Sequence, residues 1–480
     1  MALKHKRKIK KVLVANRGEI ATRIIRACKE LDIKTVAIYS EADSKGLWVK
    51  KADEAYMIPG DPIKAYLNFY KIVDLARQTR CDAIHPGYGF LSENADFARY
   101  CERKGIIFIG PKPEHIELFG DKIKSKQAMR EVGVPVLPGT DEPITDIEEA
   151  KKVAKKIGFP VIIKAAYGGG GRGMRIVRKE EEFEDLFKSA TSEAEKFFGN
   201  GAVFIEKYVE NPRHIEVQIM ADKYGNVIHL GERDCSIQRR HQKIIEIAPS
   251  PRLSEEVRRE LYRVAVKSMF KLGYENVGTL EFLVDENDNF YFIEMNTRLQ
   301  VEHPVTEMIT GIDIVQRQIQ IAEGMKLPFL QEEVQFRGYA IEFRINAEDP
   351  TKNFAPSPGK ITSYHSPGGP GVRIDAAVYK DYIIPPYYDP MIAKLIVWAL
   401  SWEQVVNRAK RALDEFIVRG TPTNLPLLRH IVRDKDFREG RFTTNYLDEK
   451  LPKFKFRREE TNPEELAVAI AAAIAAYHKL

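Results

Sequence analysis

Polar residues recur at every second position from Glu294 to Glu302 of the sequence. Residues 290–304 read FYFIEMNTRLQVEHP, and in an extended strand residues of the same parity leave the same face. The opposite face would carry Tyr291, Ile293 and Met295, which can be buried. The polar face would carry Glu294, Asn296, Arg298, Gln300 and Glu302, so one face of this stretch carries chemistry.

The preceding residues 279–284 also have the composition of a strand, and residues 286–289 have that of a turn. A hairpin with a four-residue loop pairs Asp285 with Phe290 and places Glu281 opposite Glu294, with Cβ atoms about 4.5 to 5.5 Å apart. Two bare carboxylates would repel there, whereas a hard divalent cation removes the conflict and Asn296 adds a third oxygen. The alternative is two solvated acids on an exposed face.

A second candidate site is the glycine-rich stretch 159–177, FPVIIKAAYGGGGRGMRIV. It matches Gly-x-Gly-x-x-Gly, but no helix follows and the Gly-Lys-Ser/Thr of a P-loop is missing, so neither nucleotide motif applies. We favour a glycine flap between two strands, in which backbone N–H groups approach phosphate oxygens and Lys164 supplies a point charge. A flexible hairpin loop is the alternative.

The composition limits the class of protein. A chain of 480 residues that is 44% hydrophobic exceeds one usual core, so two to four domains are expected. The 75 basic and 69 acidic residues are mixed along the chain, which argues against a nucleic-acid partner. The four cysteines form no Cys-x-x-Cys, and the longest apolar run, 466–477, is too short to span a bilayer. We therefore expect a cytoplasmic protein with neither a zinc cluster nor a membrane span.

The first 112 residues are expected to hold a parallel sheet. Strand-like stretches lie at 11–15, 35–39, 81–85 and 106–109. Helical patterns lie between them, one at 19–31 and another that follows the turn ending at residue 93 and continues to residue 104. Tyr88 follows the third of these strands, at the end where open α/β sheets bind ligands, although a structural glycine turn is an equal alternative. Residues 114–158 are mainly helical, with a Pro/Gly break at 134–139.

The segment 232–243 concentrates cations, and nucleic-acid contact is one interpretation of it. It lacks interleaved aromatic residues, so small anions are the favoured partners. The strand-like stretch 203–209 ends in charged residues that could bind an adenine edge.

Five motifs in order identify a family resemblance. They are HPGYGFLSEN at 85–94, GGGGRGM at 168–174, ERDCSIQRRHQK at 232–243, EMNTRLQVEHP at 294–304 and RINAEDP at 344–350. Together they resemble the biotin carboxylase subunit of biotin-dependent carboxylases, within the ATP-grasp group, over residues 11–447. The resemblance implies an α/β and α+β protein with an N-terminal βαβ parallel-sheet domain (1–112), an ATP-grasp domain (113–335, flap subdomain about 135–208), a C-terminal α+β cap domain (336–448) and a tail (449–480).

In that family ATP activates bicarbonate to carboxyphosphate, and the CO2 released from it is captured by N1′ of biotin. Matched by motif, the ATP phosphates are held by Lys122, Lys164, His214, Gly168, Gly169, Gly170, Gly171 and Gly173. The nucleotide is surrounded by Glu206, Lys207, Val209, Gln238 and His241. Mg²⁺ or Mn²⁺ is bound by Glu281, Glu294 and Asn296, and bicarbonate by Lys243, Arg298, Gln300 and Val301. The resemblance makes Glu302 the base, Arg344 the group that stabilises the biotin enolate, and Tyr88 a contact of the biotin end.

The resemblance also implies partners. The biotin-bearing Ala-Met-Lys-Met sequence is absent from this sequence, so biotin is expected on a separate carrier or carboxyltransferase subunit. A homodimer is expected. Pyruvate is the predicted final acceptor, with an acyl-CoA such as acetyl-CoA or 2-oxoglutarate as alternatives. A carbamoyl phosphate synthetase-like ligase, which would carry two flaps and hairpins, and a non-catalytic nucleotide-binding regulator are the other classes.

The tail has its own pattern. Asn462 and Pro463 begin a helix in which Leu466, Ile470, Ile474 and Tyr477 form one apolar stripe. A single amphipathic helix of this length is marginal in water, so the stripe needs a surface to cover it. We expect this helix either to connect to a partner or to pack on its own chain.

Overall fold

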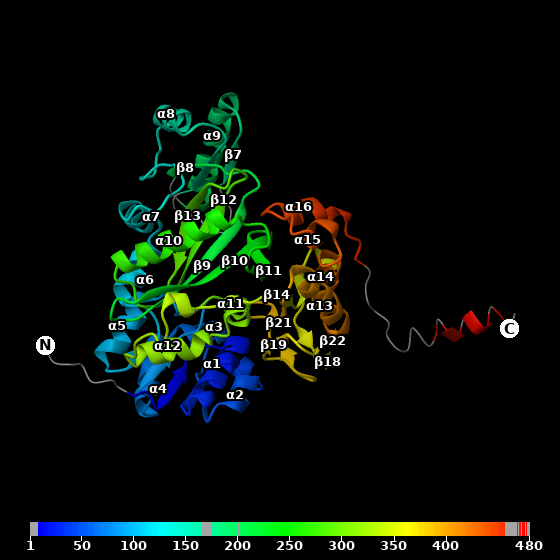
Figure 1. The fold of residues 1–480 in the computed structure, drawn as a ribbon. Coiled ribbons are helices and arrows are strands. Elements are labelled where there is room, and N and C mark those ends of the chain that lie inside the picture. Colours follow the sequence, from blue (N-terminus) through cyan, green and yellow to red (C-terminus); the bar gives the residue numbers. More distant parts are fainter. Residues whose placement is uncertain are drawn as a thin grey trace.

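The computed structural model describes residues 8–165, 174–198 and 201–456, together with helical residues 468, 470, 471, 473–475 and 477 of the tail (Figure 1). The predicted flap residues Gly168, Gly169, Gly170, Gly171 and Gly173 therefore lie outside the described residues. So does Leu466, whereas Ile470, Ile474 and Tyr477 of the predicted tail stripe are exposed. In the described part of the chain, no helix is both long and apolar enough to cross a membrane.

The N-terminal region forms the predicted parallel sheet, with strand order β3-β2-β1-β4-β5. Its strands are β1 (Lys11–Val14), β2 (Lys34–Tyr39), β3 (Glu54–Met57), β4 (Ala83–His85) and β5 (Ile107–Phe108). Helices α1 (Gly18–Glu30), α2 (Leu47–Lys51), α3 (Pro62–Leu67), α4 (Phe69–Gln78) and α5 (Ala95–Arg103) surround them. Val12, Leu13 and Val14 are all fully buried, because helices cover both faces of a parallel sheet.

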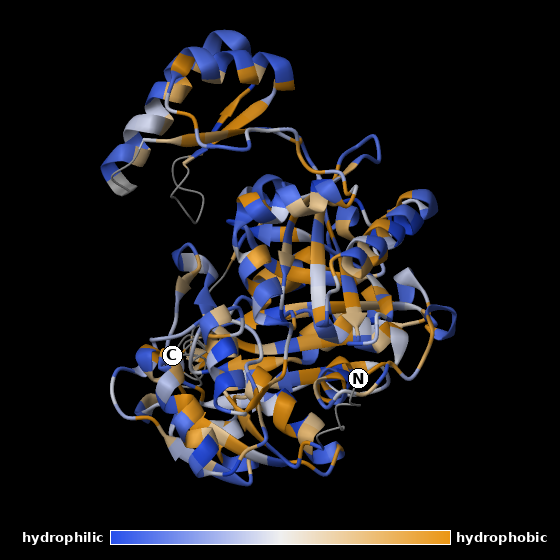
Figure 2. Ribbon diagram, turned by 90° about the vertical axis from the view of Figure 1, so that its left-hand side faces the viewer, coloured by the Kyte–Doolittle hydropathy of each residue, from blue (hydrophilic) through white to orange (hydrophobic). Residues whose placement is uncertain are grey.

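A helical segment then leads to a small separate module. The helical segment contains α6 (Pro113–Gly120), α7 (Lys122–Glu131) and α8 (Ile147–Ile157). The Asp121 side chain caps α7. The module is a three-stranded antiparallel sheet of β7 (Arg175–Val177), β6 (Val161–Ala165) and β8 (Val203–Lys207), packed against α8 and α9 (Phe183–Phe198). Figure 2 shows its apolar strands beneath helices with hydrophilic outer faces. The predicted strands on both sides of the glycine stretch are confirmed, since β6 and β7 pair.

One eight-stranded antiparallel sheet joins the centre of the chain to its C-terminal part, in the order β13-β12-β9-β10-β11-β14-β21-β19. The strands are β9 (Arg213–Ala221), β10 (Val227–Arg239), β11 (Gln242–Ala248), β12 (Asn276–Val284), β13 (Phe290–Asn296), β14 (Tyr339–Asn346), β19 (Val372–Ala376) and β21 (Met391–Ala399). β11 pairs with β14, so the sheet runs across the domain boundary expected at residue 335. The proposed division into domains therefore remains a prediction.

Helices and short strands complete this part. The helices are α10 (Glu255–Lys271), α11 (His303–Thr310), α12 (Ile314–Ala322), α13 (Trp402–Glu415), α14 (Leu425–Ile431), α15 (Lys435–Arg438) and α16 (Tyr446–Lys450). Three two-stranded ribbons pair β15 (Glu348–Asp349) with β16 (Ala355–Pro356), β17 (Gly359–Lys360) with β20 (Ile383–Ile384), and β18 (Ser363–His365) with β22 (Ile417–Arg419).

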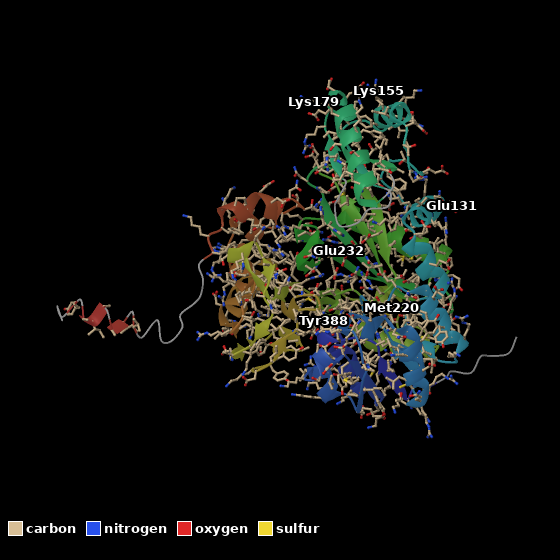
Figure 3. The ribbon with its side chains drawn as sticks, turned by 180° about the vertical axis from the view of Figure 1, so that it is seen from behind. Glu131, Lys155, Lys179, Met220, Glu232 and Tyr388 are labelled. Carbon is tan, nitrogen blue, oxygen red and sulfur yellow. The ribbon has the colours of Figure 1, made fainter. Side chains whose placement is uncertain are left out.

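The N-terminal and C-terminal parts pack directly on one another. Tyr388, labelled in Figure 3, contacts the N-terminal region: its ring lies 3.8 Å from the Arg17 guanidinium and its hydroxyl 2.6 Å from that of Ser40. Helix α1 also contacts α12, β19 and β21. All three parts of the chain thus meet around α1.

The hairpin of β12 and β13 has the predicted partners but not the predicted loop. Val284, and not Asp285, pairs with Phe290, so the loop has five residues. A register shift between Glu281 and Phe282 then places Glu281 opposite Glu294, as predicted. The shift compensates for the extra residue in the loop, so Glu281 and Glu294 face one another as they would with the predicted four-residue loop.

The strand prediction fails beyond Asn296. β13 ends there, residues 297–302 form a loop with a turn at 301–302, and Glu302 precedes α11, where Pro304 stands at a position that favours helix starts. The expected burial also differs, because Met295 is buried but Tyr291 and Ile293 are only partly buried. Phe292 is instead fully buried against Phe282, with ring centroids 6.1 Å apart.

Candidate functional site

Glu281 of β12 lies at the centre of a buried polar cluster. Its carboxylate accepts hydrogen bonds from His214 (2.6 Å), Asn296 (2.7 Å), Lys243 (3.0 Å) and Gln300 (3.0 Å). Burial raises the pKa of Glu281, but Lys243 and His214 outweigh burial and hold the pKa well below its usual value. The carboxylate is therefore ionised at neutral pH. Three segments far apart in the sequence supply its four donors.

Glu294, opposite Glu281, is in a different state. The Glu294 side chain is partly open to solvent, but the desolvation of its carboxylate by the surrounding protein and the Glu281 charge raise its pKa, while Lys122 lowers it less. Among the residues that the structure describes, no hydrogen bond or ion pair to the Glu294 carboxylate is present. Glu281 is ionised, and its charge raises the pKa of the facing Glu294. A divalent cation bound by oxygen atoms of both carboxylates would stabilise both negative charges, so the pair fits such an ion.

The third predicted metal ligand, Asn296, is differently engaged. Its amide nitrogen donates to Glu281, and its Oδ1 accepts a hydrogen bond from Arg298 at 2.8 Å. A half-turn of the amide would present the oxygen to the carboxylate pair, so its role as a ligand remains a prediction. His214, Glu216 and Glu281 also offer ligand atoms within 4.8 Å of one another. The Glu216 carboxylate is a member of this group that the sequence interpretation missed.

Lys243 is held by three carboxylates. Its ammonium lies 2.6 Å from Glu216, 2.8 Å from Glu302 and 3.0 Å from Glu281. Burial lowers the pKa of Lys243, but the three acids outweigh burial and raise the pKa well above its usual value. A permanent positive charge therefore lies between the predicted metal ligand and the predicted base.

Glu302 is fully buried and accepts hydrogen bonds from Lys243 at 2.8 Å and from Arg344 at 3.0 Å. Burial raises the pKa of Glu302, yet Lys243 and Arg344 outweigh burial and hold the pKa well below its usual value. Arg344 also donates to Glu246 at 2.5 Å. An ionised carboxylate between two cations can accept a proton from a substrate anion bound by those cations.

The loop that precedes Glu302 is fixed from both the N-terminal region and the C-terminal part. Arg298 donates to Glu93 at 2.8 Å and to Gln300 at 2.9 Å. The carbonyl of Val301 accepts a hydrogen bond from Lys394 at 2.8 Å. The sequence interpretation missed both Glu93 and Lys394, although Glu93 lies within the motif at 85–94.

Tyr88 reaches the same region from the end of β4, and its hydroxyl donates to Glu19 of α1. The Arg344 charge acts on Tyr88 and lowers its pKa, while burial, the larger effect, raises the pKa well above its usual value. Tyr88 thus joins the end of β4 to α1 through Glu19.

The predicted nucleotide residues are only partly brought together. Lys164 and Lys126 both form ion pairs with Glu206. Burial raises the pKa of Glu206, but the two lysines outweigh burial and lower the pKa to about 2. Gln238 donates to Nδ1 of His214 at 2.8 Å, which leaves Nε2 to donate to the acid cluster.

The remaining nucleotide residues form no hydrogen bond with the acid cluster in the described structure. Lys207 donates to the carbonyls of Gly158 (2.9 Å) and Phe159 (3.0 Å). Val209 follows β8 in a loop, and His241 is exposed in the β10–β11 turn. The roles of these three residues remain predictions.

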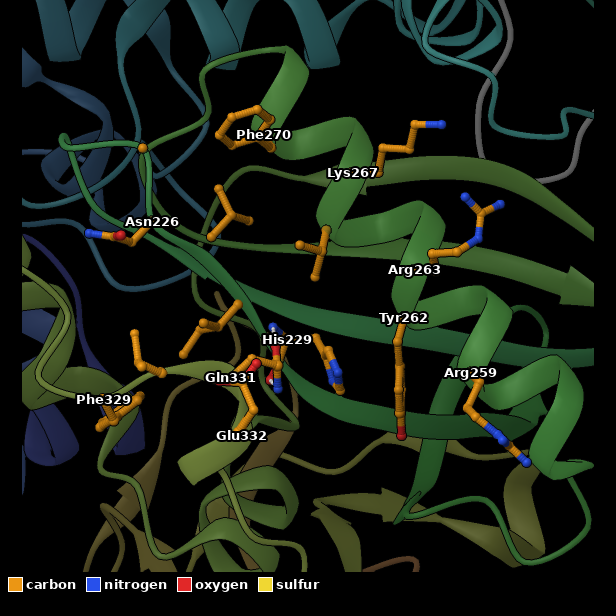
Figure 4. Close-up of a pocket in the computed structure, with 15 residues that line it drawn as sticks. Asn226, His229, Arg259, Tyr262, Arg263, Lys267, Phe270, Phe329, Gln331 and Glu332 are labelled. Carbon is orange, nitrogen blue, oxygen red and sulfur yellow. Dashed lines mark hydrogen bonds between the residues drawn. The ribbon is translucent and has the colours of Figure 1, made fainter.

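A cavity of about 790 Å³ lies elsewhere, between the start of β10, α10 and residues 329–332 (Figure 4). His229, Tyr262 and Phe270 line it, with Arg259 and Lys267 beside them. Within the described ranges, none of the predicted site residues lines this cavity. The acid cluster is thus the better candidate for chemistry, because its charges converge on one point.

The paired acids lead to a metal-binding prediction. Replacing Glu294 with glutamine should weaken Mn²⁺ binding about tenfold or more in the presence of ADP, because one charged oxygen ligand is lost. Titration of free Mn²⁺ by electron paramagnetic resonance measures the affinity. Glu286→Gln, which removes an exposed acid from the hairpin turn, is the control and should change nothing. Equal affinities of the wild type and Glu294→Gln would contradict a metal between the acids.

Comparison with known families covers most of the chain. Residues 8–116 match the biotin carboxylase N-terminal domain, residues 121–330 the ATP-binding domain of carbamoyl-phosphate synthase L chain, and residues 342–449 the biotin carboxylase C-terminal domain.

Curated relatives agree. The 2-oxoglutarate carboxylase small subunit of Hydrogenobacter thermophilus is 58% identical over 471 residues, 98% of this chain and 100% of the relative. A pyruvate carboxylase subunit of Methanothermobacter thermautotrophicus is 55% identical, over 92% of this chain and 89% of the relative. Biotin carboxylase 1 of Bacillus subtilis is 53% identical, over 92% of this chain and 98% of the relative.

Two solved structures superpose closely on this fold. The biotin carboxylase domain dimer of the Hydrogenobacter thermophilus 2-oxoglutarate carboxylase, in complex with MgADP, ADP and bicarbonate, has a TM-score of 0.88 at 58% identity and covers 94% of this chain and 100% of its own. The biotin carboxylase subunit of a pyruvate carboxylase has a TM-score of 0.85 at 56% identity, with the same coverage.

Proposed function

Because this chain belongs to the biotin carboxylase family and is an ATP-dependent ligase that carboxylates biotin, we propose that the cluster around Lys243 and Glu302 carries its reaction. The observation that supports this most is the buried Glu302 carboxylate, held ionised between Lys243 and Arg344. A base in that position lies beside Lys243, one of the groups proposed to bind bicarbonate.

The nucleotide would bind between the small module and the large sheet. Lys122, Lys164 and His214, with the flap glycines, would contact the ATP phosphates, and Lys164 would exchange its contact with Glu206 for a phosphate. Glu281 and Glu294 would hold Mg²⁺, which neutralises phosphate charge when bound. The residues present fit that ion, because one acid is ionised and its charge raises the pKa of the other.

Bicarbonate would bind beside Lys243, Arg298, Gln300 and the Val301 backbone. Glu302 would remove its proton, so that a bicarbonate oxygen attacks the γ-phosphorus and the bond to ADP breaks. The product, carboxyphosphate, breaks down to CO2 and phosphate. The released phosphate would take the N1′ proton of biotin, and N1′ would then bond to CO2, while Arg344 stabilises the negative charge on the ureido oxygen of the biotin enolate and Tyr88 contacts the biotin end.

Purified protein should hydrolyse ATP only with Mg²⁺ and bicarbonate, and faster when free biotin is added. The reason is that phosphoryl transfer needs the bicarbonate oxygen as its nucleophile, and biotin removes the CO2 that is formed. Release of phosphate measures the rate, and omission of each component in turn is the control. Turnover that is unchanged without bicarbonate would exclude carboxyphosphate chemistry, and an absence of turnover would favour a regulatory nucleotide-binding protein.

The natural form of biotin would be carried by a separate carrier or carboxyltransferase subunit. A homodimer is proposed because the related 2-oxoglutarate carboxylase domain is described as a dimer. The tail helix remains a candidate connector, since Ile470, Ile474 and Tyr477 are exposed.

The final carboxyl acceptor is proposed to be a 2-oxo acid. The relative that matches along its full length belongs to a 2-oxoglutarate carboxylase, and the Methanothermobacter relative belongs to a pyruvate carboxylase. Pyruvate, the acceptor predicted from sequence, and 2-oxoglutarate share the 2-oxo acid group. Assays of the assembled enzyme with pyruvate, 2-oxoglutarate and acetyl-CoA would distinguish the acceptors.

A further inference from the structure

Lys394 is a fully buried cation at the junction of the three parts of the chain. It projects from β21, and its ammonium donates to the carbonyl of Val301 at 2.8 Å and lies 3.1 Å from the Glu19 carboxylate. Val301 belongs to the loop proposed to bind bicarbonate, and Glu19 belongs to α1 of the N-terminal region. One side chain of the C-terminal part thus contacts both other parts.

The surroundings explain why a lysine is stable there. An unpaired buried ammonium is strongly destabilising, so acids must face it. The charges of Glu19, Glu342 and Asp375 act on Lys394 in its favour, and that of Arg373 opposes them. Asp375 is engaged by Arg373 at 2.7 Å, and both oxygens of Glu342 lack a hydrogen-bond partner within the described residues. Glu19 is therefore the acid that contacts Lys394 directly.

Glu19 continues the contact to Tyr88. The same Oε1 of Glu19 accepts the Tyr88 hydroxyl, and the Tyr88 ring lies 6.0 Å from the Lys394 ammonium. The Tyr88 backbone is fixed as well, because Asn16 donates to its carbonyl at 2.8 Å. A row of direct contacts thus runs from Val301 through Lys394 and Glu19 to Tyr88, from the bicarbonate end of the site to the biotin end.

We propose that Lys394 is a positioning residue that fixes the bicarbonate loop relative to Tyr88, so that CO2 is released within reach of biotin. This inference rests on the proposed function. Misplacement of two reactants by about 1 Å can lower a rate about 10²-fold, so a rigid link between their two binding elements has a kinetic effect. Bicarbonate activation needs only the loop, whereas carboxylation of biotin needs the loop and Tyr88 together.

The test is the variant Lys394→Met, which keeps the length of the side chain and removes the ammonium. Carboxybiotin formed from free biotin and bicarbonate-dependent ATP hydrolysis without biotin are measured on the same sample. We expect carboxybiotin formed per ATP hydrolysed to fall about tenfold or more, with a rise in the KM for biotin. A purely structural role would lower both activities together, and an unchanged ratio would overturn the proposal.

Lys450→Met is the matched control. Lys450 also pairs with two carboxylates, Asp434 at 3.0 Å and Asp436 at 2.5 Å, but these acids lie in the C-terminal part and contact no proposed site residue in the described chain. In the Lys450→Met variant, the amount of carboxybiotin formed per ATP hydrolysed should stay at the wild-type value. If the wild type itself shows no bicarbonate-dependent hydrolysis, the proposed function fails and not the positioning role.

The double variant Lys394→Met/Glu19→Gln keeps the proposal testable if the single variant folds poorly. It removes one charge of each sign, so the buried charge balance is preserved. If the two residues act as one link, the double variant should lose no more carboxybiotin per ATP than the worse single variant. Losses that multiply would mean that the two residues act separately, which would overturn the proposal.

Discussion

Replacing Glu302 with glutamine is expected to lower turnover by at least about 10²-fold while nucleotide affinity stays near that of the wild type. Glutamine keeps the size of the side chain and can still accept a hydrogen bond from Lys243 or from Arg344 through its one oxygen, but it cannot take a proton. Glu302 lies between these cations, and its side-chain contacts in the described structure do not include a residue assigned to the ATP phosphates. Steady-state phosphate release and fluorescence titration with an ATP analogue measure the two quantities.

Glu246→Gln is the matched control for this variant, because Glu246 also pairs with Arg344 but does not contact Lys243 in the described structure. Burial raises the pKa of Glu246 to about 7, so glutamine resembles a form that is already populated near neutral pH. We expect a much smaller loss than with Glu302→Gln. Comparable losses would mean that Glu302 acts by orienting Arg344, and a parallel loss of nucleotide affinity would make Glu302 a structural residue.

Replacing Lys243 with methionine is expected to lower turnover about 10²- to 10³-fold and to destabilise the protein by about 3 to 5 kcal/mol. The ammonium is the shared partner of Glu216, Glu281 and Glu302, so three buried carboxylates would face one another without it. The pKa of Glu302 should then rise, because the cation that lowers it most is gone. Thermal unfolding and phosphate release measure the two effects.

A second substitution separates stability from catalysis. In Lys243→Met/Glu216→Gln one of the three carboxylates is neutral, so part of the lost stability should return. Turnover should not return, because the cation proposed to bind bicarbonate is still missing. Two results would show that Lys243 serves only to neutralise the acids. One is recovery of both stability and turnover in the double variant, and the other is turnover of Lys243→Met within tenfold of the wild type.

Local patterns were sufficient to predict several features. The parity of residues 279–296 and the turn composition between them predicted the hairpin and the facing of Glu281 and Glu294, which is confirmed. Apolar runs separated by helical patterns predicted the N-terminal parallel sheet. Both predictions succeed because side-chain alternation and turn chemistry depend on residues close in sequence. The order of the motifs identified the family, which the comparisons confirm.

The prediction that the strand continues to Glu302 failed because side-chain alternation alone does not distinguish a strand from a loop. Alternating polar residues are compatible with a strand, but here distant partners place them: Glu281 places Asn296 and Gln300, Glu93 places Arg298, and Arg344 places Glu302. Glu294 and Asn296 lie in β13, whereas Arg298, Gln300 and Glu302 reach the site from the loop that follows the strand and from the start of α11. Periodicity could not distinguish these cases.

Only the tertiary structure identified Glu216, Glu246, Glu19 and Lys394 as parts of the site. Lys394 stands alone in the apolar strand Met391–Ala399, which is a signal of an unusual buried charge, but no local pattern indicates its partners. Its contacts with Val301 and Glu19 join residues 93 and 375 positions away. A buried ion pair is stable only when packing removes both charges from water and places them together, and that depends on how whole segments of the chain pack.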